Sequence, residues 1–511
     1  MKIHISSRQR YPIIRSEIMS SIPRTTMNLL FLIVCLSIII PGPCYAIIPD
    51  PQCPNISTYF DSIRSDRDEL IPFFSNMPKG GDIHIHLSGA IPPEKLIAIA
   101  ASHDLLVDPA TGQLVDQATN QPYNYTPLGP LVPVSSAYTN ATLFTFLVSK
   151  WSMAGFSFEN QTGHDWFFST FDLIDPVTYY DGELIASMRD QAASDKIRYL
   201  ELMTSQTNSD NVRQIVSQVP WDDNLSVLRK NLLDAGLVDI CRQKVQTQAT
   251  YDQVSREHAT PEGRNVIVRY TYEALRFYPL KEVFSDLLQA FEIANQSPLV
   301  EGVTLVGDES DQYSLKDYDE HMKMVGYLHS VYPDVGITLH AGELTPELVP
   351  HADLQDHISE AISTGNTSRI GHGVSIMYEK DREGVLEKMA ASHIPVEILL
   401  TSNLQILGID TADHPVSSYL DHDVPVILAT DDPGVECTNL TQEFVNLTLN
   451  KPRVSYEQIR EINLNSIKYS FLPETEKNRM LAELNESLQE YEHGVLAGYK
   501  GSPGCETAMT A

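Results

Sequence analysis

The chain has 511 residues, of which 42% are hydrophobic and 20% are charged, so it has the composition of a globular protein with a large core and not of a disordered chain. Its formal net charge at pH 7 is −31, and a surface this acidic repels phosphate backbones and anionic membranes. Nucleic acid is therefore excluded as an expected partner, and an uncharged or cationic small molecule is favoured.

Residues 1–46 have the pattern of a secretory signal. Basic residues precede an apolar run at 29–40, and the tripeptide Cys44-Tyr45-Ala46 follows, with small residues where a signal peptidase reads them. The apolar run is shorter than the roughly 20 residues that a membrane-spanning helix needs. We therefore expect cleavage after residue 46, a secreted or periplasmic location, and no membrane anchor after cleavage. An uncleaved membrane anchor is the alternative.

After this signal the sequence divides into three parts. We expect an N-terminal segment at 47–80, a main domain at 81–495 and a C-terminal tail at 496–511. If the chain is exported, the cysteines outside the signal could form two disulfides in any of three pairings; they are Cys53, Cys241, Cys437 and Cys505. No Cys-x-x-Cys pair occurs, so a thiolate zinc site is not expected.

Short apolar segments recur along the main domain. Eight of them have the composition of strands that are buried on both faces. They are, in chain order, residues 82–87, 197–204, 266–272, 300–306, 336–340, 369–372, 396–401 and 426–430. Apolar residues at helical spacing predict helices between them, as at 315–332, 352–364 and 380–392. This alternation indicates right-handed βαβ units, and eight parallel strands predict an α/β fold, a (β/α)₈ barrel of the TIM type.

Two long excursions interrupt the alternation. Residues 107–161, after the first predicted strand, are rich in Pro, Gly, Asn, Thr and Tyr, which is typical of an inserted surface subdomain or lid. Residues 205–263 form the second excursion, in which we expect a helix at 227–237. Near the end of the chain, residues 474–491 have the charged amphipathic pattern of a helix on the outside of the barrel.

Histidines and acidic residues end several of the predicted strands. His84 and His86 end the first, His340 ends the fifth, and Asp431 follows the eighth. Active sites of such barrels lie at the face where the strands end, and residues two apart on a strand point to one side. Three imidazoles and one carboxylate suit zinc, which lowers the pKa of a bound water to about 7. A lone His-x-His pair is usually structural, but the two further strand ends favour a metal site.

These strand-end motifs resemble those of a known family. Residues 82–89, Asp-Ile-His-Ile-His-Leu-Ser-Gly, resemble the first motif of the adenosine/AMP deaminase family. Residues 338–343, 369–373 and 430–433 are similar to its later motifs, in the same order. The resemblance covers roughly residues 72–495. It implies a metal-dependent hydrolase on a (β/α)₈ barrel, in an exported member of the family.

The resemblance also implies a metal and catalytic groups. One zinc ion per chain would be held by His84, His86, His340 and Asp431. Glu343 would protonate N1 of an adenine ring, as a general acid beside the metal. His372 would orient the attacking water and stabilise the tetrahedral state, and Asp431 could accept a proton. Other histidines, among them His164 and His414, lie in predicted helices and loops, and we expect about one of them to line the pocket.

The implied substrate contacts surround the same strand ends. Asp432 would hydrogen-bond N7 of the purine, His86 would contact the substrate as well as the metal, and the backbone N–H of Gly307 would reach N3. We expect glycine at position 307 because a side chain would collide with the base. Many family members carry an acidic residue at the position of Ser88, where it binds the ribose 5′-hydroxyl. Ser88 therefore leaves the specificity for the 5′ group open.

On this resemblance we expect zinc-dependent deamination of adenosine, and of 2′-deoxyadenosine, to the inosine product and ammonia. The expected partner is a small purine nucleoside, and a homodimer stays open. One alternative is deamination of another adenine derivative, such as a 5′-modified nucleoside, or amide or ester hydrolysis on a related metal barrel. The other is a non-enzymatic, growth-factor-like secreted protein on the same barrel. The filled metal and acid positions favour an enzyme.

Overall fold

The part of the chain that can be described lies between the two termini. The computed structural model describes residues 55–498, except 119–120, 123–124, 158–160 and 207–209. The predicted signal at residues 1–46 lies outside the described residues, so export stays a prediction. Within residues 55–498, outside those gaps, no helix is both long enough and apolar enough to pass through a membrane.

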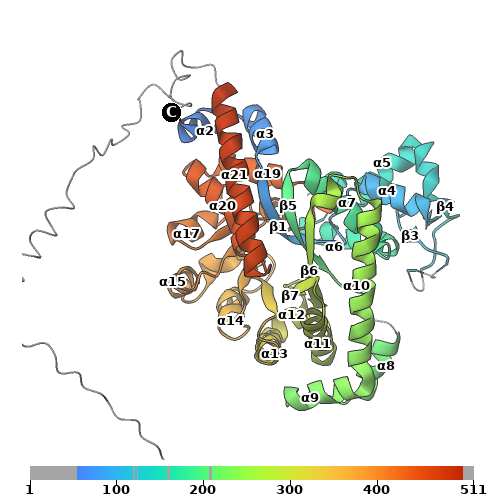
Figure 1. The fold of residues 1–511 in the computed structure, drawn as a ribbon. Coiled ribbons are helices and arrows are strands. Elements are labelled where there is room, and N and C mark those ends of the chain that lie inside the picture. The colour runs from blue at the N-terminus through green and yellow to red at the C-terminus, as the bar shows by residue number, and fades with distance from the viewer. Residues whose placement is uncertain (1–54, 119–120, 123–124, 158–160, 207–209, 499–511) are drawn as a thin grey trace, which may run out of the picture. The chain divides into compact units, whose positions relative to one another are not determined.

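Eight parallel strands form the centre of the described unit (Figure 1). Each pairs with the next in the order β1-β5-β6-β7-β8-β9-β10-β11. Their bounds are β1 Lys79–His86, β5 Ile197–Thr204, β6 Ile267–Leu275, β7 Val300–Val306, β8 Gly336–Ala341, β9 Arg369–His372, β10 Val396–Ile398 and β11 Val426–Leu428. All eight predicted apolar segments are strands, and the predicted (β/α)₈ fold is confirmed.

The barrel closes between its first and last strands. The backbone N–H of His86 donates to the carbonyl oxygen of Asp431, and that of Asp431 donates to the carbonyl oxygen of His84, both at 2.9 Å. These bonds form a parallel bridge between Ile85 and Asp431. The closure thus places the two histidines of β1 beside the carboxylate that follows β11.

β1 begins three residues before the predicted strand. The prediction missed these residues because they include a lysine, Lys79, that is buried in the structure. The side chain of Lys79 is completely buried. Its ammonium donates to the carbonyl oxygens of Phe74 and Asp195, each at 2.8 Å, and lies 3.1 Å from a carboxylate oxygen of Asp195. A lysine is normally exposed, so composition alone could not place it in a strand.

β10 is shorter than predicted, because a helix begins where the strand was expected to continue. Helix α16 spans Leu400–Leu407. The backbone N–H groups of Leu400 and Thr401 donate to one oxygen of Glu443 at 3.0 and 3.2 Å. A carboxylate at a helix N-terminus satisfies donors that the helix leaves free. The distant Glu443 therefore ends the strand and starts the helix.

Helices cover the outside of the barrel. Those on the barrel wall are α7 Asp181–Ser194, α11 Leu280–Gln296, α13 Tyr318–Val331, α14 His357–Ser363, α15 Arg382–Ser392, α17 Val416–Asp421, α19 Leu440–Asn450 and α20 Tyr456–Lys468. Helix α21, Glu474–Gly498, is the predicted C-terminal helix and includes the first residues of the expected tail. The N-terminal segment forms α2, Ile56–Ile63, and α3, Arg67–Asn76.

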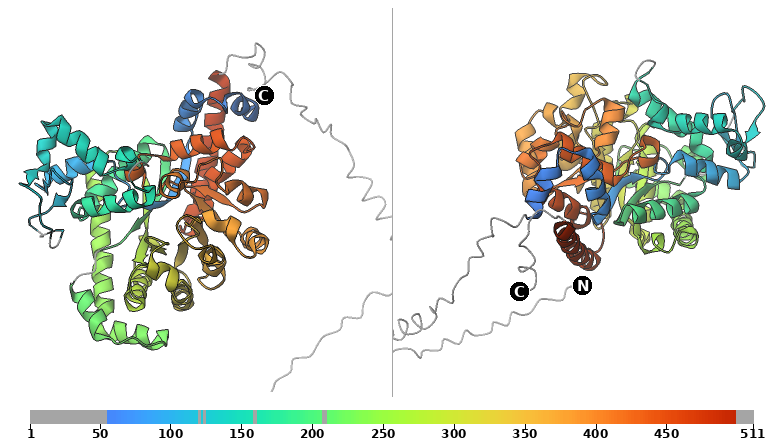
Figure 2. Two further views of the ribbon diagram at one scale, coloured as in Figure 1. Left: turned by 180° about the vertical axis from the view of Figure 1, so that it is seen from behind. Right: turned by 90° about the horizontal axis from the view of Figure 1, so that it is seen from above.

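The first excursion forms a small subdomain after helix α4, Pro93–Ser102. Its antiparallel sheet has the order β3-β2-β4, with bounds β2 Leu106–Val107, β3 Leu114–Val115 and β4 Val132–Pro133. Helices α5, Ala141–Lys150, and α6, Gly163–Ile174, follow. In both views of Figure 2 this segment, in cyan, lies on the opposite side of the barrel from the orange helices. The predicted insertion therefore has secondary structure of its own.

The second excursion is helical over far more than the predicted 227–237. Its helices are α8 Asp210–Gln218, α9 Leu225–Leu232 and α10 Val238–His258. A wide helical turn at Leu233–Leu237 joins α9 to α10, and Gly236 takes a φ of 109° there, which glycine adopts without strain. Two short helices elsewhere complete the list: α12 Gln312–Lys316 and α18 Pro433–Glu436.

Three charged side chains lie inside the barrel. Arg369, on β9, is 2.7 Å from a carboxylate oxygen of Glu201 and 2.5 Å from one of Glu397. All three side chains are at most 1% exposed. The guanidinium also lies 3.8 Å from the centre of the Phe471 ring. Since a buried charge needs an opposite charge, Arg369 stabilises two carboxylates that the barrel could not otherwise hold.

The cysteines differ from the disulfide expectation. Cys241 is a buried free thiol and Cys437 is an exposed one. The two-disulfide arrangements are therefore wrong for this chain. Cys53 and Cys505 lie outside the described residues, so their pairing stays open.

Replacing Arg369 by Met should lower the free energy of unfolding by about 3–5 kcal/mol, because two buried carboxylates lose their cation. Urea denaturation followed by circular dichroism measures this change. The matched control is Arg382→Met, which breaks an exposed ion pair with Glu383 and should cost no more than about 1 kcal/mol. Equal losses in the two variants would contradict the role given to Arg369.

Candidate metal and catalytic site

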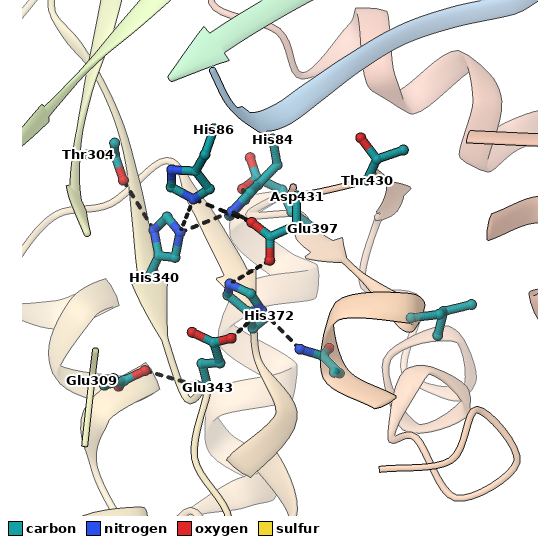
Figure 3. Close-up of polar contacts among 12 residues, drawn as sticks. His84, His86, Thr304, Glu309, His340, Glu343, His372, Glu397, Thr430 and Asp431 are labelled. Atoms are coloured by element: carbon teal, nitrogen blue, oxygen red, sulfur yellow. Dashed lines mark hydrogen bonds and ion pairs between the residues drawn. The ribbon is translucent and has the colours of Figure 1, made fainter. Parts of the chain in front are cut away.

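Three imidazoles and one carboxylate meet at the strand ends (Figure 3). Nε2 of His340, on β8, lies 3.1 Å from Nε2 of His84 and 3.0 Å from Nε2 of His86, both on β1. Oδ1 of Asp431, after β11, lies 3.6 Å from Nε2 of His84 and 3.3 Å from Nε2 of His86. The fold thus brings together the four side chains expected to bind the metal.

The outer nitrogens of the two β1 histidines are bound to protein carboxylates. Nδ1–H of His84 donates to Glu397 and Nδ1–H of His86 donates to Glu273, each at 2.6 Å. In the neutral form of each ring, with the proton on Nδ1, Nε2 carries a lone pair. These lone pairs face Nε2 of His340, and lone pairs this close repel one another. A cation among them removes the repulsion, so the donors fit a bound metal ion. Without a cation among the rings, burial opposes a charge on His86, but the carboxylates of Asp432, Glu273 and Asp431 raise its pKa to about 10, so a proton would take this place.

A chain of hydrogen bonds fixes the tautomer of His372, which lies beside the cluster. The backbone N–H of Val416 donates to Nδ1 of His414 at 3.2 Å, so the proton of His414 is on Nε2, which donates to Asn403 Oδ1 at 3.0 Å. Asn403 Nδ2 then donates to Nδ1 of His372 at 3.0 Å. The proton of His372 is therefore on Nε2, 3.8 Å from Asp431. Burial lowers the pKa of His372 to about 3, so the ring is neutral.

Glu343 reaches the same cluster from the turn after β8. Its Oε1 lies 3.6 Å from Nδ1 of His372. The backbone N–H groups of Gly342 and Glu343 donate to the two oxygens of Glu309 at 3.0 and 2.8 Å, which fixes this turn. Burial raises the pKa of Glu343 well above its ordinary value, and the nearby carboxylates of Asp431 and Glu309 raise it further. A protonated carboxyl at this position can serve as a general acid.

Two residues expected to bind a purine base follow other strands of the barrel: Asp432 lies after β11 and Gly307 after β7. Oδ1 of Asp432 is buried and has no hydrogen-bond partner among the residues described. A Cβ at Gly89 would lie 1.8 Å from this oxygen, so glycine there makes room for the carboxylate. Gly307, after β7, has a φ of +95°, and a Cβ there would lie 2.6 Å from the ring of Phe277. The structure thus gives a reason for glycine at position 307 that differs from a collision with the base.

Ser88 lies at the edge of the site. It is half-buried and lines a cavity of about 1040 Å³ at the ends of β1, β5 and β6. Met203, at the end of β5, and Glu273, the partner of His86, line the same cavity. The position that the sequence analysis singled out for the 5′ group therefore opens onto a large space.

One histidine with no role in the sequence analysis joins α6 to the rim of the barrel. Nε2 of His164 lies 3.1 Å from Oδ1 of Asp308 and 3.5 Å from the hydroxyl of Ser310. Asp308 follows Gly307 directly. The helix that follows the insertion thus contacts the loop that carries an expected substrate-binding residue.

Backbone strain marks two of the site residues. His372 has a φ of 65° and Asp431 a φ of 67°. Residues other than glycine rarely adopt this left-handed conformation, which costs of order 1–3 kcal/mol and is frequent at active sites. His372 ends β9 and Asp431 lies three residues after β11, and at both positions the turn aims the side chain at the cluster.

The sequence analysis missed three polar residues that orient the site: Glu273, Glu397 and His414. Glu273 and Glu397 lie within otherwise apolar strands, and an acidic residue at such a position was a signal that could have been used. His414 follows no strand, and its role depends on Asn403, which lies on a different element. No pattern in the sequence links these two residues.

Comparisons with known proteins give matches in sequence. Residues 248–487 match the family model described as adenosine deaminase. A curated adenosine deaminase from Vibrio cholerae is 32% identical to the chain over 194 residues, which are 37% of this chain and 52% of that protein. The chain thus spans about half the length of the curated relatives it matches.

Solved structures share the fold at low sequence identity. The apo structure of the N6-methyl-AMP deaminase from Arabidopsis thaliana superposes with a TM-score of 0.53 and 18% identity, covering 82% of this chain and 99% of that chain. A cog1816 amidohydrolase from Burkholderia ambifaria, solved with bound zinc, has a TM-score of 0.51 and 16% identity, covering 84% and 94% of the two chains. These structures agree with the barrel described above.

Replacing His84 by Ala should remove most of the bound metal, because one of the converging nitrogens is lost. We expect metal affinity to fall at least about 10-fold, the lower limit for changes even in residues that only support ligands. Metal analysis of the purified protein checks this. The control is His258→Ala at the exposed end of α10, which should keep its metal. Unchanged metal content in the His84 variant would sink the assignment.

Proposed function

We propose that the chain is a member of the adenosine deaminase family, whose model its residues 248–487 match, and that it deaminates adenosine and 2′-deoxyadenosine by hydrolysis. Water adds to C6 of the purine, ammonia leaves, and inosine or 2′-deoxyinosine forms. The observation that carries the proposal is the position of His340 and Asp431, beside Glu343. His340 and Asp431 each lie 3.0–3.6 Å from both His84 and His86.

One zinc ion per chain is part of this proposal. The donors, three imidazole nitrogens and a carboxylate oxygen, suit zinc, and the amidohydrolase from Burkholderia ambifaria was solved with zinc. When bound, the ion would lower the pKa of a water molecule and make it nucleophilic at neutral pH. Glu397 and Glu273 hold the rings of His84 and His86 in the orientation that the ion needs.

Glu343 would be the general acid. Its raised pKa favours the protonated carboxyl, and transfer of this proton to N1 would draw electrons away from C6. His372 keeps its own proton on Nε2, on the side of Asp431. It can therefore donate a hydrogen bond to the oxygen that adds to C6 and stabilise the negative charge there. Asp431 can accept a proton from the attacking water.

Three contacts would orient the base, one from each of three strand ends. Glu343 follows β8 and faces N1, Gly307 follows β7 and offers its backbone N–H to N3, and Asp432 follows β11 and faces N7. N7 only accepts hydrogen bonds, so Asp432 must donate. Burial raises the pKa of Asp432 well above its ordinary value, with Asp431 and Glu273 adding to the shift against the opposing effect of His86. This shift favours the protonated carboxyl that the bond needs.

Two other functions compete with this proposal. The fold also occurs in an N6-methyl-AMP deaminase, so the barrel by itself does not select adenosine, and Ser88 favours considering a 5′-modified adenine nucleoside. A non-enzymatic growth-factor-like protein would need no general acid and no metal. The complete set of donors beside Glu343 argues against that function. Export rests on residues 1–46 alone, and N-terminal sequencing of the secreted protein would test it.

Replacing Glu343 by Gln should lower kcat by at least about 100-fold, because the amide cannot protonate N1. The metal content should not change, because Glu343 is not a ligand. The absorbance change from adenosine to inosine measures the rate, and metal analysis measures the zinc. Glu347→Gln, an exposed neighbour, is the control and should keep full activity. Near-normal turnover in the Glu343 variant would refute its role as the acid.

Replacing Asn403 by Leu should lower kcat by about 10- to 100-fold, because His372 loses the donor that keeps its proton on Nε2. KM and zinc content should change little. Asn450→Leu, at the exposed end of α19, is the matched control. An unchanged kcat, or a loss of zinc in parallel with kcat, would show that Asn403 does not position His372.

A further inference from the structure

The cavity beside the metal cluster is larger than the proposed reaction needs. Its volume is about 1040 Å³, at the upper end of the range for small-molecule sites. Ser88, Thr204 and Glu273, at the ends of β1, β5 and β6, form its inner wall. Gly307, Glu343 and Asp432 do not line it. The purine base would therefore lie beside this space and would not fill it.

The direction of the sugar follows from the order of the strands, and this step rests on the proposed function. N1, N3 and N7 of the base face the ends of β8, β7 and β11. N9, which carries the sugar, lies between N3 and N7 on the side away from N1. Going round the barrel from β7 to β11 on that side, one meets β6, β5 and β1. The sugar thus points into the cavity that these three strands wall.

A ribose alone would leave most of this volume empty. Beyond the strand ends the cavity continues between residues of helices α7, α8, α10 and α11. Leu184, Val212 and Val216 line it there, and each is at most 6% exposed. Buried apolar walls are stabilised by an apolar ligand that displaces water. The outer part is thus built for a substituent larger than a hydroxyl group.

Charge decides which substituents are accepted. Five carboxylates line the cavity: Asp175, Asp181, Glu273, Glu282 and Asp286. The cations are Lys244 and Arg213. The ammonium of Lys244 donates to the carbonyl oxygen of Gln206 at 2.8 Å and lies near Asp286, whose charge it offsets, while Arg213 is 68% exposed. Acidic side chains still outnumber the cations. The walls are therefore negative, and a phosphate group would be repelled.

The pKa of Asp181, one of these carboxyls, also indicates that the cavity does not favour a further negative charge. Burial, together with the nearby carboxylate of Glu273, raises the pKa of Asp181 to about 7. Two acidic groups this close cannot both hold a negative charge at low cost. A further anion in the cavity would add to this repulsion, while a neutral or cationic group would not.

We infer that this cavity binds the 5′ side of an adenine nucleoside that is extended beyond the ribose by a neutral or cationic group, and that it rejects 5′-phosphates. Ser88 permits the extension because its short, uncharged side chain leaves the path from the ribose into the cavity open. The substrate class is thus set by the walls around β1, β5 and β6, while the metal cluster sets the reaction.

The first test compares kcat/KM for four probes: adenosine, 5′-methylthioadenosine, 5′-amino-5′-deoxyadenosine and AMP. We expect the methylthio and amino compounds to match or exceed adenosine, and AMP to be at least about 100-fold poorer, which corresponds to about 2.7 kcal/mol. If AMP equals adenosine, or both extended probes are 10-fold poorer than adenosine, the inference fails while the proposed function stands. If no probe releases ammonia, the proposed function fails.

The second test fills the cavity. Val216→Trp, on the wall formed by α8, should raise the ratio of KM for 5′-methylthioadenosine to KM for adenosine about 10-fold or more, because only the extension meets the new ring. Val227→Trp, 39% exposed on α9, is the matched control and should change neither value. Circular dichroism verifies that both variants fold. Equal effects on the two substrates, or no effect of Val216→Trp, would overturn the inference.

Discussion

The mutual repulsion of imidazole lone pairs at the strand ends is the constraint on which the centre of this protein depends. Nε2 of His340 faces the corresponding atoms of His84 and His86 at about 3 Å. When the rings are neutral, that arrangement favours a bound cation, and carboxylates behind the rings of His84 and His86 keep the protons on Nδ1. Glu397, one of these carboxylates, is buried and needs Arg369, which in turn pairs with Glu201. The need to orient His84 at the rim is thus met by a row of paired charges inside the barrel, which runs from Glu397 through Arg369 to Glu201.

Most of the fold could be predicted because parallel strands buried on both faces are continuous apolar runs. All eight runs are strands, and the ligands were found because each ends or follows one of them. The failures share a cause. Lys79 extends β1 through partners on α3 and before β5, and Glu443 ends β10 from α19. Contacts between residues far apart in sequence leave no local pattern, and the pairing of Asn403 with His414 belongs to the same class.

The site separates two tasks that a single pocket often combines. In the proposed function, side chains at or after the ends of β8, β9 and β11 would surround the reacting carbon, whereas the ends of β1, β5 and β6 open onto a space bounded in part by helices of the second excursion. A barrel allows this division because each strand end carries its own loop. The chemistry can therefore stay constant while loops and helices on one side change what else the ligand carries.

Met153, Phe167, Ile406 and Val435 form one small apolar cluster. Met153 belongs to the insertion and Phe167 to α6, while Ile406 and Val435 lie on α16 and α18, next to the catalytic loops. Deleting the inserted segment would therefore expose apolar side chains of this cluster at the rim. It would also remove packing that supports the loop that carries Asp431 and Asp432. The subdomain and the rim of the site share one apolar cluster. A shortened version of this protein would therefore need different side chains at that rim to keep it packed.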